Sequence, residues 1–328
     1  MSGLRRRISI SALVVSLALA ATACGGGGST TSSGTGGLEK TDLTVGMLPL
    51  PEVAPVQIAI DKGFFKAEGL NVKVQTIQGG AAAMGELASG KLDVLHSNYV
   101  SALKASAENV AKLKVIAEAY VAKPNNFLLM AKKDSPVTSM ADLKGKKIAV
   151  NTLNNVATLT VSAQLEVAGL KPEDVQFVEH PFPEMPGMLE QGQIDAAFLP
   201  EPFHELAASK NGAKTITDLM QGPTADFPIA GYLVTEEFAS KNPKTVAAFQ
   251  RGLTKAIELA ISNSDEVDAA LPKYTKIDQA TADLMQLGGY STSVNPTRLQ
   301  RVADLMLKFG YLKAKFDVAP LVHSPAAS

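Results

Sequence analysis

Hydrophobic runs of strand length alternate with longer apolar runs of helical spacing through most of the chain. Residues 43–47 and 71–77 alternate apolar and polar side chains, which is typical of strands. Between them, residues 56–67 place apolar side chains at helical spacing and end at Gly69. Strands that alternate with helices in this way build a parallel sheet. The pattern therefore predicts an α/β fold.

One short phrase occurs twice. Residues 87–94 (LASGKLDV) return as residues 189–196 (LEQGQIDA). In both copies a helical run ends at a glycine, which is expected to take the left-handed conformation of a helix C-cap. An apolar strand with one aspartate near its start follows each glycine. Because the order of strands and helices before the phrase also repeats, we predict two Rossmann-like lobes with a groove between them.

The lobe boundaries follow from the two apolar runs that we expect to cross between lobes, residues 127–131 and 227–234. Lobe 1 is then residues 41–126 plus 229–328, and lobe 2 is residues 127–228. The expected strands are residues 43–47, 71–77, 94–95 and 113–119 in lobe 1, and 147–151, 173–179 and 196–199 in lobe 2. Helical spacing at residues 243–262, 267–274, 278–287 and 296–309 predicts a C-terminal group of helices that packs on the lobes.

The first forty residues are expected to direct export and anchoring rather than to fold with the lobes. Arg5, Arg6 and Arg7 precede an apolar stretch of signal-peptide length, so residues 1–23 are predicted to be a signal peptide. Residues 21–24 (ATAC) resemble a bacterial lipobox, with Ala21 where Leu is usual. This resemblance implies a lipid on Cys24, and the alternative is secretion with an unmodified Cys24. The Gly/Ser/Thr-rich residues that follow predict a flexible tether, within residues 24–40.

Composition excludes several classes of protein. Hydrophobic residues make up 46% of the chain and charged residues 19%, which indicates a core-forming protein. The formal net charge of −1 argues against a nucleic-acid partner, because such binding depends on Lys and Arg. The single cysteine excludes an intrachain disulfide and a Cys-rich metal site.

Candidate binding residues lie where strands end and helices begin. In parallel sheets ligands bind beyond the carboxyl ends of strands, where helix N-termini present free N–H groups. In lobe 1 these loops are residues 49–54, 79–81 and 97–99, and in lobe 2 they are residues 151–155, 180–186 and 200–203. Tyr232 on the return run is added as an aromatic contact. The predicted ligand-binding residues are Pro49, Pro51, Glu52, Gly80, Ala81, Ser97, Asn98, Tyr99, Asn151, Thr152, Asn154, Asn155, Phe182, Glu184, Glu201 and Tyr232.

Several motifs together resemble one known family. Residues 63–72 (GFFKAEGLNV) are similar to the GFF-K-x-E-GLDV signature of substrate-binding proteins for nitrate, sulfonate and taurine importers. The paired Gly-x-x-Asp phrase, residues 145–150 (GKKIAV) and residues 201–203 (EPF) belong to the same pattern. The resemblance covers roughly residues 42–260. It implies a type II periplasmic-binding-protein fold, and thiamine-precursor pyrimidine binders are related.

The resemblance also implies a function. It indicates a monomeric, extracytoplasmic, lipid-anchored subunit without cofactor or catalysis. This subunit captures a small sulfonate-, taurine-, nitrate- or pyrimidine-like solute between the two lobes and delivers it to an ABC permease and its ATPase. It further implies that Glu201 faces the cleft. A carboxylate there favours a ligand with an amine or N–H donor, whereas the alternative is a helix N-terminal Glu that interacts with its own dipole. No Arg occurs in the proposed loops, so bidentate recognition of an anion is not expected from them.

Two alternatives stay open at this point. His96, His180 and His204 each follow a strand and could form a metal site with Glu201 as fourth ligand. An enzyme on the same scaffold is the other alternative, although the chain has no Gly-x-Ser-x-Gly elbow, Walker loop or dinucleotide fingerprint.

Overall fold

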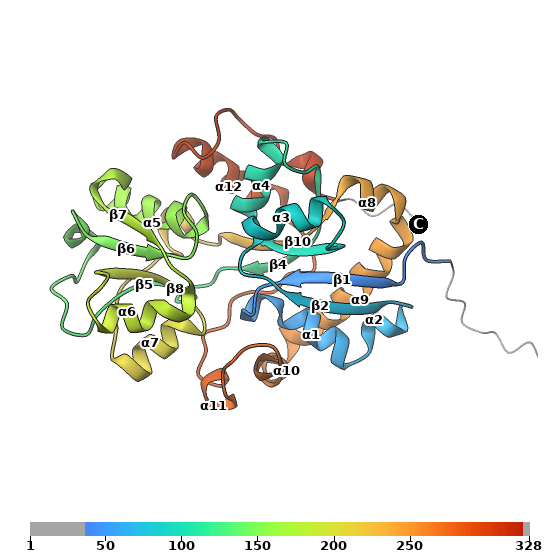
Figure 1. Ribbon diagram of the computed structural model, residues 1–328, viewed down its shortest axis with the longest axis horizontal. Coiled ribbons are helices and arrows are strands. Elements are labelled where there is room, and N and C mark those ends of the chain that lie inside the picture. The colour runs from blue at the N-terminus through green and yellow to red at the C-terminus, as the bar shows by residue number, and fades with distance from the viewer. Residues whose placement is uncertain (1–36, 324–328) are drawn as a thin grey trace, which may run out of the picture. The chain divides into compact units, whose positions relative to one another are not determined.

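The structure is a computed structural model that describes residues 37–323. The predicted signal peptide, Cys24 and most of the tether lie outside this range. The described residues belong to one compact unit, whose strands form two five-stranded sheets. Figure 1 shows these sheets as two lobes, each with helices on both faces.

The sheet of lobe 1 has the strand order β2-β1-β3-β10-β4. Strand β1 runs parallel to β2 and β3, whereas β10 is antiparallel to both β3 and β4. The prediction of a parallel sheet is therefore confirmed for β1, β2 and β3 but not for β10, which returns from the other lobe and enters the sheet from the opposite end. The strands are β1 (Asp42–Met47), β2 (Asn71–Thr76), β3 (Val94–Asn98), β4 (Leu113–Val121) and β10 (Pro228–Thr235).

Lobe 2 repeats this arrangement with the order β7-β6-β8-β5-β9. Here β5 is the antiparallel strand, between β8 and β9. The edge strand β9, with the sequence KTITD, was not predicted from the sequence, because its polar composition resembles a loop. The strands are β5 (Phe127–Ala131), β6 (Lys147–Val150), β7 (Gln176–Glu179), β8 (Ala196–Pro200) and β9 (Lys214–Asp218).

The repeated phrase has the same structural role in both lobes. Gly90 and Gly192 have positive φ angles of 75° and 68°, which confirms the predicted left-handed helix ends. Each following aspartate bonds to the start of the neighbouring strand. Asp93 accepts a hydrogen bond from the N–H of Thr44 at 2.9 Å, and Asp195 accepts one from the N–H of Lys147 at 2.9 Å. The predicted internal repeat is thus confirmed in its hydrogen bonds.

The two crossings between lobes differ from the prediction. Residues 127–131 are fully buried within the sheet of lobe 2, and the chain crosses just before them, through residues 122–126. Similarly, β10 lies in the sheet of lobe 1, and the return crossing is the segment that precedes it. The reason is that an apolar run needs strand neighbours on both sides, whereas the polar residues KPNN at 123–126 suit an exposed connection.

A third segment runs beside the first crossing. The backbone of Gly289 pairs with that of Val121 through two hydrogen bonds of 2.8 Å. Nearby, Asn126 Nδ2 donates to the carbonyl of Gln286 at 2.5 Å. These contacts explain why only Gln279–Ala282 of the predicted helix 278–287 is helical, since the residues after it extend along the crossing.

The helices cover both faces of the sheets. In lobe 1, α1, α2 and α9 pack together on one face, and α3, α4 and α12 lie on the other (Figure 1). Gly63, with φ of 72°, separates α1 from α2 where one continuous helix was predicted. The helices are α1 (Ala54–Asp61), α2 (Phe64–Ala67), α3 (Gly80–Ala88), α4 (Tyr99–Ala107), α5 (Val156–Val167), α6 (Met185–Glu190), α7 (Phe203–Asn211), α8 (Glu236–Lys241), α9 (Pro243–Ser262), α10 (Ser264–Ala270), α11 (Gln279–Ala282) and α12 (Pro296–Lys308), with short 3-10 turns that include η1 (Pro51–Val53) and η4 (Phe182–Glu184).

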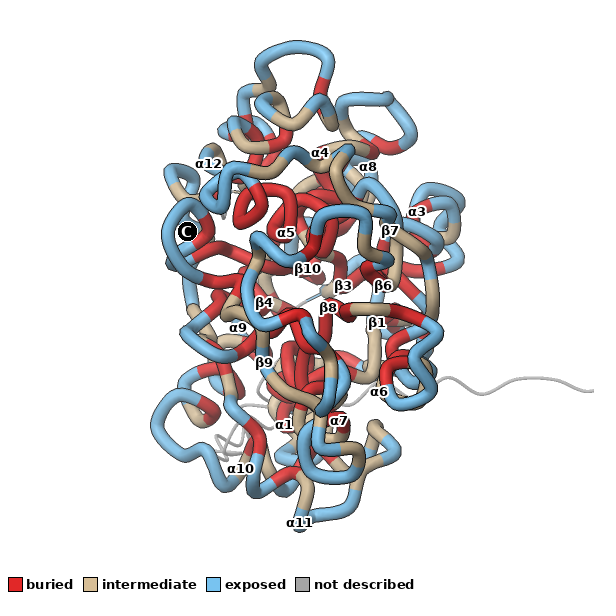
Figure 2. Tube along the Cα trace, turned by 90° about the vertical axis from the view of Figure 1, so that its left-hand side faces the viewer, coloured by how far each residue is buried: buried red, intermediate tan, exposed pale blue. Residues whose placement is uncertain are grey.

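Burial follows the layers. Figure 2 shows buried residues along the strands and the inner sides of the helices, and exposed residues on the outer loops. Among the described residues, no helix combines the length and apolar character needed to cross a membrane.

Candidate functional site

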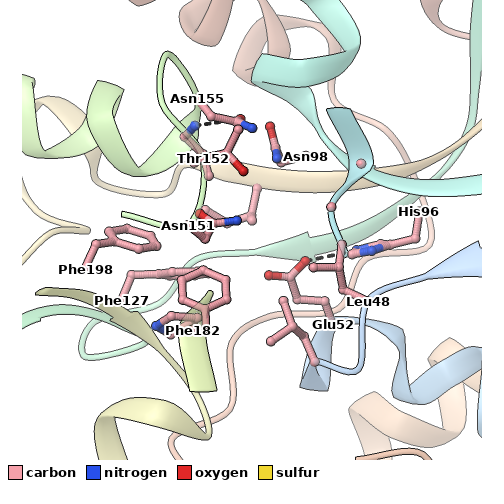
Figure 3. Close-up of a pocket in the computed structure, with 16 residues that line it drawn as sticks. Leu48, Glu52, His96, Asn98, Phe127, Asn151, Thr152, Asn155, Phe182 and Phe198 are labelled. Carbon is pink, nitrogen blue, oxygen red and sulfur yellow. Dashed lines mark hydrogen bonds and ion pairs between the residues drawn. The ribbon is translucent and has the colours of Figure 1, made fainter. Parts of the chain in front are cut away.

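A small cavity lies between the two lobes and is lined from both (Figure 3). Its volume is about 40 Å³. The ends of β1, β3, β6 and β8 and the segments that follow them contribute to its lining, as expected for a site at the carboxyl ends of strands. The lining residues are Leu48, Leu50, Glu52, Gly79, Gly80, His96, Asn98, Phe127, Asn151, Thr152, Asn155, Val156, Phe182, Phe198, Pro200 and Ile229.

Seven of the predicted residues line this cavity, from three loops of lobe 1 and two of lobe 2. They are Glu52, Gly80, Asn98, Asn151, Thr152, Asn155 and Phe182. The others do not line it: Pro49, Pro51, Ala81, Ser97, Tyr99, Asn154, Glu184, Glu201 and Tyr232. Ala81, Asn154 and Glu184 are exposed, whereas Ser97, Tyr99, Glu201 and Tyr232 are buried elsewhere.

Sequence reasoning missed the apolar lining. Phe127 and Ile229 were assigned to the crossings, Phe198 was placed in the expected strand 196–199, and Pro200 stood in the predicted loop 200–203 without being named as a contact. The signal that could have found them is their position at strand ends that meet the groove. His96 was considered only as a metal ligand, although it stands in the strand that leads into the predicted loop 97–99.

The lobe 1 wall of the cavity contains a buried carboxylate beside an imidazole. Oε2 of Glu52 lies 3.0 Å from Nε2 of His96, and both residues are almost fully buried. The contact lacks hydrogen-bond geometry, so both ring nitrogens of His96 are without a hydrogen-bond partner. In Figure 3 the Glu52 carboxylate points towards the side of the cavity where Phe182 lies.

Tyrosines from the C-terminal helical region hold the backbone around Glu52. The hydroxyl of Tyr274 donates to the carbonyl of Leu50 at 3.0 Å, and that of Tyr290 donates to the carbonyl of Pro51 at 2.8 Å. Burial, with a smaller contribution from the Glu52 carboxylate, raises the pKa of Tyr232. The ring of Tyr232 packs against His96 at a centroid distance of 5.8 Å. Glu52 and His96 are therefore positioned by residues outside the cavity.

The lobe 2 wall is aromatic. Phe198 has ring centroids 5.7 Å from Phe127 and 6.2 Å from Phe182. Phe203 stacks on the outer side of Phe182 at 5.5 Å. Such rings offer a solute a large apolar area in a fixed orientation.

Two asparagines cap the helices that start at the cavity. Asn98 Oδ1 accepts from the N–H of Ser101 at 2.9 Å, and Asn155 Oδ1 accepts from the N–H of Val156 at 2.8 Å. Asn155 Nδ2 also donates to Ser101 Oγ at 3.0 Å, which joins α5 of lobe 2 to α4 of lobe 1. In contrast, Oδ1 of Asn151 is buried without a hydrogen-bond partner.

Glycine at position 80 is required by packing. A Cβ added to Gly80 would lie 2.1 Å from Ser97 Oγ and 2.9 Å from Ser97 Cα. The start of α3 therefore approaches the end of β3 more closely than any side chain permits. No side chain caps this helix start.

Tyr99 supports the fold from inside lobe 1. Its hydroxyl would be 2.7 Å from a Cβ added to Gly231 of β10, so its ring fills the space that this glycine leaves. Burial raises the pKa of Tyr99 well above its ordinary value. Tyr99 thus belongs to the core of lobe 1, because the first turn of α4 directs it onto the sheet.

Glu201 lies at the crossing between lobes rather than in the cavity, which corrects the expectation that it faces the cleft. Its Oε1 accepts from the N–H of Gln286 at 2.7 Å and lies 3.2 Å from Nε2 of His204. Burial raises the pKa of Glu201 to about 8 and lowers the pKa of His204 to about 4. Burial therefore favours the uncharged form of both groups.

The proposed three-histidine metal site does not form. His96 lines the cavity, His204 is buried beside Glu201, and His180 is half-buried on its loop. Within residues 37–323, no group of three or more His, Cys, Asp or Glu side chains is arranged to hold a metal ion.

Comparisons with known proteins agree with the architecture. The family profile described as NMT1/THI5 like matches residues 50–267. The taurine-binding periplasmic protein of Escherichia coli K12 is 31% identical over 235 residues, which cover 69% of this chain and 69% of that protein. The alkanesulfonate-binding protein SsuA from Xanthomonas axonopodis pv. citri, solved with MOPS bound, superposes with a TM-score of 0.74 at 17% identity, over 88% of this chain and 99% of that one.

The same fold also occurs in an enzyme. The desulfurization enzyme DSZB superposes with a TM-score of 0.64 at 14% identity, over 84% of this chain and 94% of that chain. The fold alone therefore does not separate binding from catalysis.

Proposed function

The chain belongs to the NMT1/THI5-like family, and we propose that it is the extracytoplasmic solute-binding subunit of an ATP-driven importer. It captures a small solute between lobe 1 (residues 41–126 plus 229–328) and lobe 2 (residues 127–228). The closed form then delivers the solute to a membrane permease and its ATPase. Relatives that are named as periplasmic binding proteins support this assignment.

The observation that carries the proposal is the position of the cavity. Its lining comes from both lobes (Figure 3). The bond between Asn155 and Ser101 joins the lobes beside it. A solute that contacts both walls stabilises the closed arrangement of the lobes. Periplasmic binding proteins close around their ligands by a hinge motion of this kind.

We infer that the solute is released unchanged. The ionisable side chains that line the cavity are one carboxylate and one imidazole, Glu52 and His96. Thr152 supplies the one hydroxyl of the lining. It belongs to lobe 2, whereas Glu52 and His96 belong to lobe 1. Nothing in this set resembles an activated nucleophile with its base and orienting group.

The anchor and the oligomeric state remain proposals from the sequence. We propose that Cys24 carries the lipid and that the protein acts as a monomer held at the outer membrane face. Replacement Cys24→Ser is expected to move the protein from the membrane fraction to the soluble extracytoplasmic fraction. Retention of the variant in the membrane fraction would contradict the lipid anchor.

Native mass spectrometry of the purified protein tests the function. We expect a mass increment for a small bound solute, which is lost on denaturation and recovered chemically unchanged. Conversion of the recovered compound during incubation with the protein would instead assign an enzyme. A protein that shows no increment, even after incubation with extracts of the growth medium, would contradict solute binding.

A further inference from the structure

The carboxylate of Glu52 lacks a donor. The residue is 5% exposed, its carboxylate accepts no hydrogen bond from residues 37–323, and its one ion-pair contact there is with His96 at 3.0 Å. The nearest polar atom, Nε2 of His96, is close but wrongly oriented. A buried carboxylate costs several kcal/mol unless a partner compensates it. Because this carboxylate faces the cavity, the compensating group is expected on the solute.

The rest of the lining carries no positive side chain. Neither Lys nor Arg is among the residues that line the cavity. Oδ1 of Asn151, a second acceptor, is buried there without a partner. The wall therefore presents two unused acceptors, and the matching solute presents N–H donors.

An anion is poorly served by the same surroundings. At the starts of α4 and α5, one N–H group each, of Ser101 and Val156, is already bonded to the side chain of Asn98 or Asn155. The uncapped start of α3 offers N–H groups at Gly80, but one helix start carries only a partial charge. A sulfonate or nitrate would place its negative charge beside the Glu52 carboxylate in a cavity that neither Lys nor Arg lines.

Size and shape restrict the solute further. A water molecule needs roughly 10–15 Å³ by a comparable measure, so a cavity of about 40 Å³ suits a solute of a few heavy atoms. The flat wall made by Phe182 and its aromatic neighbours favours a planar group. Aromatic faces also attract cations.

We propose that the solute is a compact planar cation of the amidinium or guanidinium type. Its N–H groups bind the Glu52 carboxylate and the Asn151 carbonyl oxygen, and its flat face lies against Phe182. The inference rests on the proposed function, since it names the chemical class of the transported solute. Glu52 is then the counter-ion that selects the solute.

Isothermal titration with defined probes tests this class. Guanidinium and acetamidinium chloride at low millimolar concentration represent the cations, and taurine, methanesulfonate and nitrate represent the anions. We expect saturable binding of at least one cation, tighter than any of the anions. The variant Glu52→Gln keeps the shape but removes the charge, and is expected to lose about 100-fold in affinity for the cation.

The matched control is Glu184→Gln, which removes a carboxylate from an exposed position that the sequence also suggested as a ligand contact. It should bind the cation as the unmodified protein does. Circular dichroism checks that Glu52→Gln is folded. Glu52→Asp serves as a second variant, which keeps the carboxylate but moves it away from the cavity by the length of one methylene group.

Three outcomes would overturn the inference. They are tighter binding of an anion, equal cation binding by Glu52→Gln, and no binding of either cation. In the first case the protein still binds a solute, so the proposed function survives and only the solute class changes. Failure of the proposed function has a different signature, namely chemical conversion of the bound compound.

Discussion

The molecule contains two buried Glu–His contacts with nearly the same spacing and opposite surroundings. Glu52 and His96 lie 3.0 Å apart in the cavity wall, and Glu201 and His204 lie 3.2 Å apart at the crossing between lobes. Oε1 of Glu201 has a backbone partner in the N–H of Gln286, whereas within residues 37–323 the Glu52 carboxylate has the His96 contact and no backbone donor. Similar residues at similar distances thus differ in their surroundings: a backbone N–H holds one oxygen of Glu201, whereas Glu52 lines the cavity.

The difference shows how burial alone can mislead. At the crossing, burial favours the uncharged forms of both groups, and the backbone satisfies one carboxyl oxygen. Both contacts leave buried polar atoms without a partner among residues 37–323, namely both ring nitrogens of His96 at the cavity, and Oε2 of Glu201 and Nε2 of His204 at the crossing. An unsatisfied polar group that faces a cavity points to a ligand, whereas a satisfied one points to the stability of the fold.

The largest expected effect is on the free energy of unfolding, and it distinguishes Glu201 from Glu52. Replacement Glu201→Ala leaves the N–H of Gln286 without its acceptor and opens a space beside His204. We expect a loss of about 3 kcal/mol in the free energy of unfolding, with solute affinity changed less than about threefold. Urea denaturation and titration measure the two quantities, with Glu184→Ala as the exposed control. A large loss of affinity without loss of stability would make Glu201 a ligand contact after all.

The second effect is a dependence of stability on pH. The folded-state pKa of Glu201 is raised to about 8 from an ordinary value of 4.5, so the unfolded state releases its proton first as pH rises. Stability therefore falls with rising pH up to about pH 8. His204, with its pKa lowered to about 4 from 6.5, opposes this trend only below pH 6.5.

Between pH 6.5 and 8 we expect Glu201 to reduce the free energy of unfolding by about 2 kcal/mol. Glu118, whose pKa burial raises to about 7, adds to the fall at the lower end of this window. Urea denaturation at the two pH values measures the change, and Glu201→Gln should remove most of it. An unchanged pH dependence in Glu201→Gln would assign the titration to another group.

A smaller effect distinguishes closure of the lobes from recognition of the solute. Ser101→Ala removes the hydroxyl that accepts from Asn155 across the lobes. We expect a loss of about 1 kcal/mol from the closed form, and hence about fivefold in solute affinity, without a change in preference among solutes. Titration of the same panel of probes measures both. A changed order of preference would show that Ser101 contacts the solute.

The smallest effect concerns the backbone that carries Glu52. Tyr290→Phe removes the hydroxyl that donates to the carbonyl of Pro51. We expect solute affinity to fall about threefold. The changes in the free energy of unfolding caused by Tyr290→Phe and Glu201→Ala should add in the double variant, because the two positions share no partner. Combined variants analysed by titration and denaturation test this. Strong coupling between the two would contradict the separation of the two sites.

The fold could be predicted in large part because its information is local. Apolar periodicity located most strands and helices, and the twice-used Gly-x-x-Asp phrase revealed the repeat of the two lobes. Gly90 and Gly192 adopt the expected helix ends, and Asp93 and Asp195 make matching bonds. Directions of strands β5 and β10 could not be read in the same way, because they depend on which lobe the chain has just left.

Only about half of the predicted site residues line the cavity. The amide loop after β6 and the loop with Glu52 were found because both stand at strand ends before helices. Glu201 and Tyr99 occupy similar positions in the sequence, yet one bonds to Gln286 and the other fills the space beside Gly231. These partners are far away in the sequence, so no local pattern announces them.

By itself, then, the sequence determined the two lobes, their repeated topology, and the polar loops that meet at the groove. Periodicity and turn residues suffice for this, since both act between near neighbours in the chain. The tertiary structure decided which carboxyl group lines the cavity and which bonds to the backbone at the crossing. That choice depends on the N–H of Gln286 and on tyrosines from the C-terminal region, which only folding brings to the two sites.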